Sequence, residues 1–181
     1  MRALFVGFAV LISGVGGAGI APAFAQSGYD RPGSDYTSFA VTNGDPAVCA
    51  SRCEREKGCR SWSFSYPPAT GGPAMCFLKR EVAPRVASGC CVSGVHGAGV
   101  IEPRIGEVEY SIDRPGGDYR IFDTTPDPRG KPCAEACHGE SRCRAFTYRR
   151  PGYGATAARC FLKEKITPPR RRPCCISGVL R

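Results

Sequence analysis

The chain has 181 residues, a formal net charge of +9, twelve cysteines, sixteen prolines and twenty-three glycines. This length has room for one ordinary domain or two small ones, and small domains need covalent cross-links because they bury little surface. The glycine and proline content predicts a loop-rich, cross-linked chain.

Residues 1–25 have the pattern of a secretory signal peptide. Arg2 precedes an apolar stretch, and Ala23-Phe24-Ala25 forms a small-x-small cleavage pattern before Gln26. An uncleaved membrane anchor is the alternative interpretation. All twelve cysteines follow the cleavage point, and an oxidising compartment favours disulfides. We therefore expect an exported protein, in the periplasm or outside the cell, with no membrane span after cleavage.

The rest of the chain consists of two copies of one unit, offset by about 84 residues. "DRPGSDY", "CFLK" and "CCVSGV" in the first copy return as "DRPGGDY", "CFLK" and "CCISGV" in the second. The six cysteines of the copies match one to one: Cys49, Cys53, Cys59, Cys76, Cys90 and Cys91, then Cys133, Cys137, Cys143, Cys160, Cys174 and Cys175. We predict domains at 26–96 and 109–181, joined by a linker over 97–108.

Each copy predicts a short helix between strands. Asp45-Pro46 is typical of an N-cap followed by proline at the first helical position, and Gly58 of a terminator, so a helix is expected over 46–57. Pro132 predicts a shorter equivalent. Cys49 and Cys53 are four residues apart and share one helix face.

Strands are expected on both sides of this helix. In "RSWSFSY" the aromatic residues alternate with serines, which predicts a half-buried strand, and "RAFTYR" repeats the pattern. In "CFLK", Cys76 and Leu78 share one strand face, whereas Phe77 and Lys79 share the other. The predicted fold class is α+β, with two small disulfide-rich modules that each pack one helix on an antiparallel sheet.

These residues resemble the PAN/apple domain family, in the manner of bacterial exported proteins with tandem modules. The resemblance rests on the Cys-x3-Cys helix, the third cysteine before an aromatic strand, and the fourth cysteine in "CFLK". It implies one helix on a curled sheet and a protein or carbohydrate ligand. It also implies four disulfides: Cys49 to Cys76, Cys53 to Cys59, Cys133 to Cys160, and Cys137 to Cys143.

The adjacent pairs Cys90-Cys91 and Cys174-Cys175 depart from the family pattern. With the other cysteines placed, a bridge within each pair closes each domain as a rigid terminal turn. Bridges between repeats or chains, a reshuffled pairing, and reactive or metal-binding thiols are the other possibilities.

Charge is distributed unequally between the copies. Residues 26–96 carry eight basic and six acidic residues, whereas 109–181 carry fifteen and eight. On the curled sheet that the resemblance implies, Arg144 and Lys163 would lie near the arginine triplet at 170–172 and form a concave basic surface that attracts polyanions. Its candidate ligand-binding residues are Arg144, Arg149, Arg150, Lys163, Lys165, Arg170, Arg171 and Arg172. A merely solvated surface is the alternative. Tyr153, in a glycine-containing loop, is a candidate for stacking on sugar rings.

The sequence has no recognisable catalytic motif. His96 and His138 have no counterpart in the other copy, and no nucleophile elbow, phosphate loop or His-x-x-x-His pair is present. We expect no enzymatic activity, no cofactor, no bound metal and no nucleic acid partner. The predicted function is binding of a protein or carbohydrate ligand, with an anionic glycan among the candidates. The alternatives are thiol-disulfide or metal handling by the adjacent cysteines, and an accessory role in an envelope or protease assembly.

Overall fold

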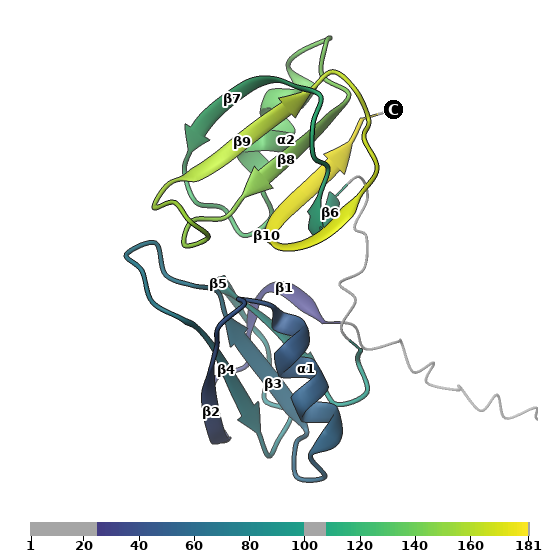
Figure 1. Ribbon diagram of the computed structural model, residues 1–181. Coiled ribbons are helices and arrows are strands. Elements are labelled where there is room, and N and C mark those ends of the chain that lie inside the picture. Colours follow the sequence, from purple (N-terminus) through teal and green to yellow (C-terminus); the bar gives the residue numbers. More distant parts are fainter. Residues whose placement is uncertain (1–24, 100–107, 181) are drawn as a thin grey trace, which may run out of the picture.

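The computed structural model describes residues 25–99 and 108–180, which form two modules of the same design (Figure 1). The first contains β1 (Gln26–Asp30), β2 (Asp35–Val41), α1 (Pro46–Arg55), β3 (Ser61–Ser65), β4 (Ala74–Lys79) and β5 (Val86–Val95). The second contains β6 (Val108–Asp113), β7 (Asp118–Thr124), α2 (Lys131–His138), β8 (Ala145–Arg149), β9 (Ala158–Lys163) and β10 (Arg170–Val179). The predicted signal peptide, apart from Ala25, and most of the predicted linker lie outside the described residues. None of the described helices is long and apolar enough to span a membrane.

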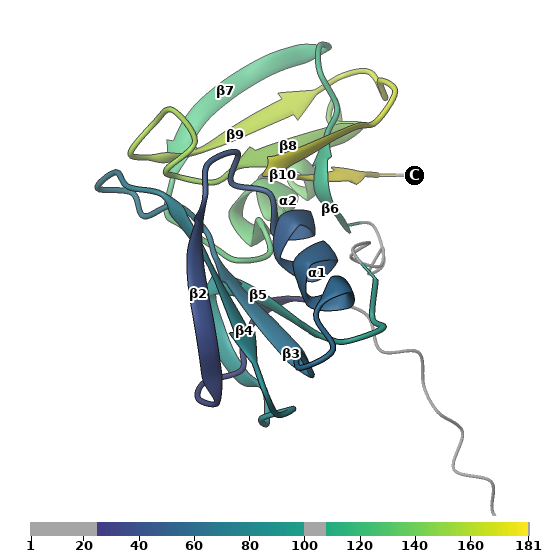
Figure 2. The same cartoon turned by 60° about the horizontal axis from the view of Figure 1, so that its bottom comes forward.

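Each module is a five-stranded antiparallel sheet covered on one face by its helix, as the sequence predicted. The strand orders are β1-β5-β3-β4-β2 and β6-β10-β8-β9-β7. Helix α1 packs on β3 and β4, and α2 packs on β8 and β9 (Figures 1 and 2). The predicted α+β class is confirmed.

The helix starts follow the local sequence, but the end of α1 does not. The Asp45 carboxylate accepts a hydrogen bond from the Ala47 N–H at 2.9 Å, which caps α1 as predicted. The prediction that α1 extends to residue 57 is wrong, because Glu56 adopts an extended conformation. The Glu56 carboxylate instead accepts a hydrogen bond from the Tyr36 hydroxyl at 2.6 Å. A tertiary contact thus coincides with the early end of the helix.

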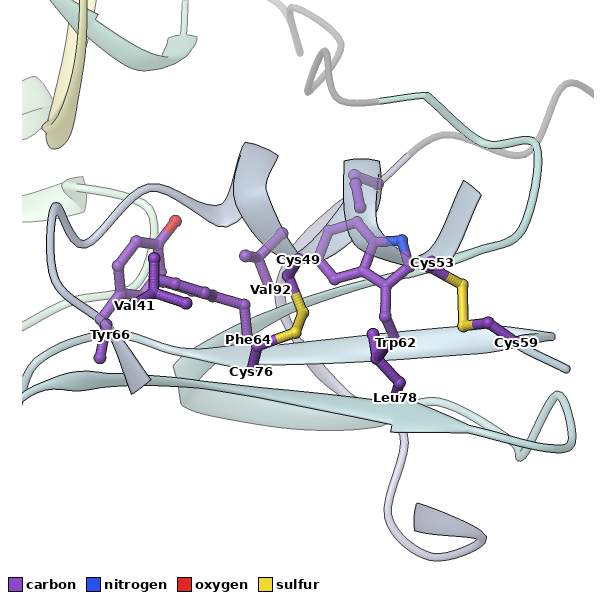
Figure 3. Packing of buried hydrophobic residues seen from close by; sticks show 13 residues of the cluster. Val41, Cys49, Cys53, Cys59, Trp62, Phe64, Tyr66, Cys76, Leu78 and Val92 are labelled. Atoms are coloured by element: carbon purple, nitrogen blue, oxygen red, sulfur yellow. A yellow bond between two sulfur atoms is a disulfide. The ribbon is translucent and has the colours of Figure 1, made fainter. Parts of the chain in front are cut away.

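The core of the first module lies between α1 and the sheet (Figure 3). Trp62, Phe64 and Leu78 are each at most 1% exposed and lie on the face under the helix. The disulfide from Cys49 to Cys76 joins α1 to β4, and the one from Cys53 to Cys59 joins α1 to the segment before β3 (Figure 3). The second module has the equivalent pairs Cys133 with Cys160 and Cys137 with Cys143. These are the pairings that the family resemblance implied.

Strand β3 is buried on both faces, so the prediction of a half-buried strand is wrong. Ser61 and Ser63 are at most 2% exposed although they alternate with the core aromatics. The Ser63 hydroxyl accepts a hydrogen bond from the Arg31 N–H at 3.1 Å, and the Ser61 hydroxyl donates to the Glu81 carbonyl at 2.5 Å. Loops therefore cover the second face and pair these hydroxyls, as buried polar groups require.

The prediction that the adjacent cysteines form a terminal turn is wrong. They lie inside the long strands β5 and β10. Each pair forms its own disulfide, Cys90 to Cys91 and Cys174 to Cys175. The pairing of β1 with β5 shifts at this point, so that Ser27 pairs with Val92 but Tyr29 pairs with Ala87. The extra residues of β5 form a bulge, which contains the disulfide. Strand β10 has the same irregularity against β6, between Arg171 and Ile176.

The repeated tail "SGV" after each cysteine pair has a packing explanation. Gly94 lies opposite Trp62 in the ladder between β3 and β5, and Gly178 lies opposite Phe146. A Cβ atom on Gly94 would lie 2.7 Å from the Trp62 ring. The glycine therefore makes room for the largest core side chain.

The two modules contact each other through several side chains. The Arg171 guanidinium forms two hydrogen bonds with the Asp45 carboxylate, at 2.5 and 3.0 Å, and the Tyr153 hydroxyl donates to the Gly44 carbonyl at 2.5 Å. The Arg150 guanidinium lies 4.1 Å from the centre of the Tyr66 ring, a cation–π distance. Tyr153, predicted as a candidate for stacking on sugar rings, is half-buried because it packs in this interface.

Candidate functional site

Both modules have a hollow on the sheet face away from the helix, which we call the outer hollow. It measures about 210 Å³ in the first module and about 240 Å³ in the second. Equivalent residues line both, since each has two aspartates, a proline and glycine from the "DRPG" turn, a phenylalanine, a lysine and the second cysteine of the adjacent pair. Three motifs that are far apart in the sequence therefore meet at one place in each module.

The "DRPG-DY" motif shapes the rim of the outer hollow. The Asp30 carboxylate accepts a hydrogen bond from the Arg31 N–H at 2.7 Å, and Gly33 has a φ of 88°, which favours glycine. Asp35 then begins β2 and forms an ion pair with Lys79 across the sheet. The motif is thus a tight turn that presents two carboxylates to the hollow.

A buried lysine forms the base of each hollow. Lys79 and Lys163 are 2% and 1% exposed, and each pairs with one aspartate, Asp35 or Asp118. Each ammonium also donates to a carbonyl of the turn, 3.3 Å away. The sequence pattern predicted that Lys79 lies on the strand face away from the core, but it did not predict that Lys79 is buried. The turn that covers Lys79 is more than forty residues away in the chain.

The two hollows differ in charge. Ser65 and Ser88 of the first module correspond, at an offset of 84, to Arg149 and Arg172 of the second. Two aspartates and one lysine give the first hollow a formal charge of −1, whereas the two added arginines bring the second to +1. The second hollow is therefore suited to an anionic ligand.

The arginines of the second hollow are only partly engaged by other residues of the protein. Arg149 lies with its guanidinium 5.7 Å from the centre of the Phe161 ring, and its buried Nε has no hydrogen-bond partner among the described residues. Arg172 is more than half exposed, and its Nε lies 3.7 Å from the Asp113 carboxylate. A planar guanidinium is well shaped to bind a carboxylate, sulfate or phosphate group.

The structure brings together only part of the predicted basic surface. Arg149, Lys163 and Arg172 line the second hollow, and the exposed Lys165 lies beside Gly117 in the neighbouring turn. Arg170 is exposed at the start of β10.

The other predicted residues lie elsewhere. Arg144 is at the opposite end of β10 from the arginine triplet, where its carbonyl accepts a hydrogen bond from Leu180. The prediction that it joins the triplet is wrong because the triplet begins the ten-residue strand β10 and is not a loop. Arg150 and Arg171 contact the first module and hold the interface.

All twelve cysteines are paired in disulfides. Among residues 25–99 and 108–180, no cluster of three or more histidine, cysteine, aspartate or glutamate side chains is arranged to hold a metal ion. His96 lies 3.7 Å from the Glu54 carboxylate, and His138 ends α2.

The geometry defines a class of protein, namely tandem disulfide-stapled modules with one helix on an antiparallel sheet. The family model described as PAN domain matches the chain twice, at residues 29–79 and 112–163, and the chain belongs to this family. PAN domains are generally protein- or carbohydrate-binding modules and are typically non-catalytic. No curated protein matches the sequence. Both matched segments end before β5 and β10, so the adjacent cysteines lie outside them.

Proposed function

We propose that this protein is an exported, non-enzymatic binding protein whose second module binds an anionic glycan in its outer hollow. Export is supported by the six disulfides and by the signal pattern of residues 1–25. Binding is the general role of the family. The observation that carries the ligand class is the charge difference between two otherwise equivalent hollows, −1 in the first module and +1 in the second.

The lining of the second hollow fits an acidic sugar. Phe161 offers an aromatic surface to the apolar face of a sugar ring, and the carboxylates of Asp113 and Asp118 can accept hydrogen bonds from hydroxyl groups. Arg149 and Arg172 supply the charge for a carboxylate or sulfate group. The first hollow keeps the aromatic ring and the carboxylates but has no arginine.

The test is a reciprocal exchange of the residues that differ. Arg149→Ser with Arg172→Ser places in the second module the serines found at the equivalent positions of the first, and Ser65→Arg with Ser88→Arg does the opposite. Each lost hydrogen bond to a charged group costs about 1.5 to 3 kcal/mol, so the double serine variant should bind dextran sulfate or polygalacturonate at least about tenfold more weakly. Its affinity should also depend less on salt concentration.

Two controls complete the design. Arg144→Ser removes one exposed positive charge from the far end of β10 and should change retention on the polysaccharide column much less than either hollow arginine. Arg171 is left intact, because its pair with Asp45 joins the modules and its loss would confuse binding with docking. Equal losses from Arg144 and from the hollow arginines would show that only overall charge matters, and would refute the site.

A further inference from the structure

A second pocket lies where the two modules meet. It measures about 300 Å³, in the range of small-molecule sites, and residues of both modules line it. Five of its twelve lining residues are prolines and two are tyrosines, so rigid rings form most of its wall. This composition distinguishes it from the two outer hollows, which are rich in charged groups.

One charged side chain of this pocket lacks the partners that its burial requires. Arg150 is only 5% exposed, and its Nε and Nη2 atoms have no hydrogen-bond partner among the described residues. Its Nη1 makes one long hydrogen bond, 3.4 Å, to the Pro128 carbonyl, and the guanidinium stacks on the Tyr66 ring. A buried arginine is normally compensated by an anion, because removing its charge from water is costly.

The nearest acid in the pocket lining is engaged elsewhere. One Asp127 carboxylate oxygen accepts hydrogen bonds from the N–H groups of Arg129 and Lys131, at 2.8 and 2.9 Å, at the start of α2. No carboxylate of the described residues lies within ion-pair distance of Arg150. The pocket lining thus contains one positive and one negative side chain, Arg150 and Asp127, which do not pair with each other, beside an apolar wall.

We infer that the pocket between the modules binds a small organic acid, with its carboxylate on the Arg150 guanidinium and an aromatic or aliphatic body against the proline and tyrosine rings. The guanidinium fork matches a carboxylate, and the scarcity of polar groups disfavours a sugar, whose hydroxyls would lose their hydrogen bonds to water. Because Tyr66 and Arg150 belong to different modules, the ligand would bridge them. This inference does not rest on the proposed glycan site, which uses other residues.

The first experiment compares an acid with its amide on the disulfide-bonded two-module protein. 3-Phenylpropionate and 3-phenylpropionamide have the same body but differ in charge, and ligand-observed NMR measures the affinity of each. A hydrogen bond to an ionised group is the stronger kind, so the acid should bind at least about tenfold more tightly than the amide. Equal binding of both probes, binding of neither, or tighter binding of galacturonate would overturn the inference.

Two variants test the location. Arg150→Met should abolish the preference for the acid over the amide. Because it also removes the contact with the Tyr66 ring, unchanged binding of the amide is the check that the pocket is intact. Gly89→Trp places a large side chain on a residue that lines the pocket, where an added Cβ atom would meet nothing within 4 Å. This variant should weaken the binding of both probes. If Arg150→Met misfolds, Gly89→Trp decides alone, and unchanged binding in that variant would refute the site.

The polysaccharide column separates this inference from the proposed function. Retention of the wild-type protein on dextran sulfate tests the outer hollow without any organic acid. Either site can therefore fail while the other stands.

Discussion

The three disulfides of a module should contribute very unequally to its stability. They close loops of 27, 6 and 1 residues in sequence separation, from Cys49 to Cys76, Cys53 to Cys59, and Cys90 to Cys91. Loop-closure entropy at 25 °C then gives about 3.5, about 2 and about 1 kcal/mol respectively. We predict that replacing Cys90 and Cys91 by alanine leaves the module folded, whereas replacing Cys49 and Cys76 removes a large part of its stability.

The burial of the cysteines supports the same ranking of the disulfides by their contribution to stability. Cys49 and Cys76 are fully buried, so their replacement also leaves space in the core, whereas Cys90 is exposed. The total stability of a domain is about 5 to 15 kcal/mol, so the loss of the longer loop removes most of the stability of a domain near the lower end of that range. Loss of the adjacent pair should be tolerated.

The chain offers a selective probe for this measurement. Trp62 is the single tryptophan and is 1% exposed in the core of the first module, so its fluorescence during urea unfolding reports on that module. With a slope of about 1 kcal/mol per molar urea, the Cys49/Cys76 variant should unfold about 2 to 3 M earlier than the Cys90/Cys91 variant. Alanines at Cys133 and Cys160 provide the control, since they should move the Trp62 transition far less.

The result that refutes this reasoning is a Cys90/Cys91 variant as unstable as the Cys49/Cys76 variant. The stability would then come from the bulge that the adjacent pair forms, and not from loop closure.

Two further predictions concern module docking and pH. Gly152→Ala would place a Cβ atom 2.4 Å from the Pro67 carbonyl oxygen and should separate the modules, which raises the radius of gyration in small-angle X-ray scattering. Gly154→Ala is the control, because Gly154 has a similar positive φ but open space around it, and this variant should leave the radius of gyration unchanged. Burial and a hydrogen bond to Glu56 raise the pKa of Tyr36 to about 12, and Tyr119 has the same value for the same reasons, through Glu140. Because the pKa is raised in the folded state, this stabilisation is complete below pH 10 and is lost as the pH rises through about 12. Absorbance at 295 nm should therefore show that these two tyrosines ionise at a higher pH than the others. Ionisation of all tyrosines near pH 10 would contradict the two contacts.

Local sequence was sufficient wherever the determining residues are close together in the chain. The Asp45-Pro46 start of α1 and the four-residue spacing of Cys49 and Cys53 depend on contacts within one turn or one helix. The repeat supported these predictions, because each pattern occurred twice. One prediction failed where a distant residue is involved: α1 ends two residues earlier than predicted, at the point where the Glu56 carboxylate accepts a hydrogen bond from the Tyr36 hydroxyl.

The sequence by itself determined that the chain contains two copies of one disulfide-stapled module with matching cysteine spacing, and that the second copy is the more basic one. Only the tertiary structure decided which basic residues line a common hollow. It buried Lys163 beneath the "DRPG" turn, used Arg171 to join the modules, and left Arg149 and Arg172 at the outer hollow. A charge in the sequence does not reveal its partner, because ion pairs and pockets form between residues that lie tens of positions apart and meet only when the strands pair and the modules dock.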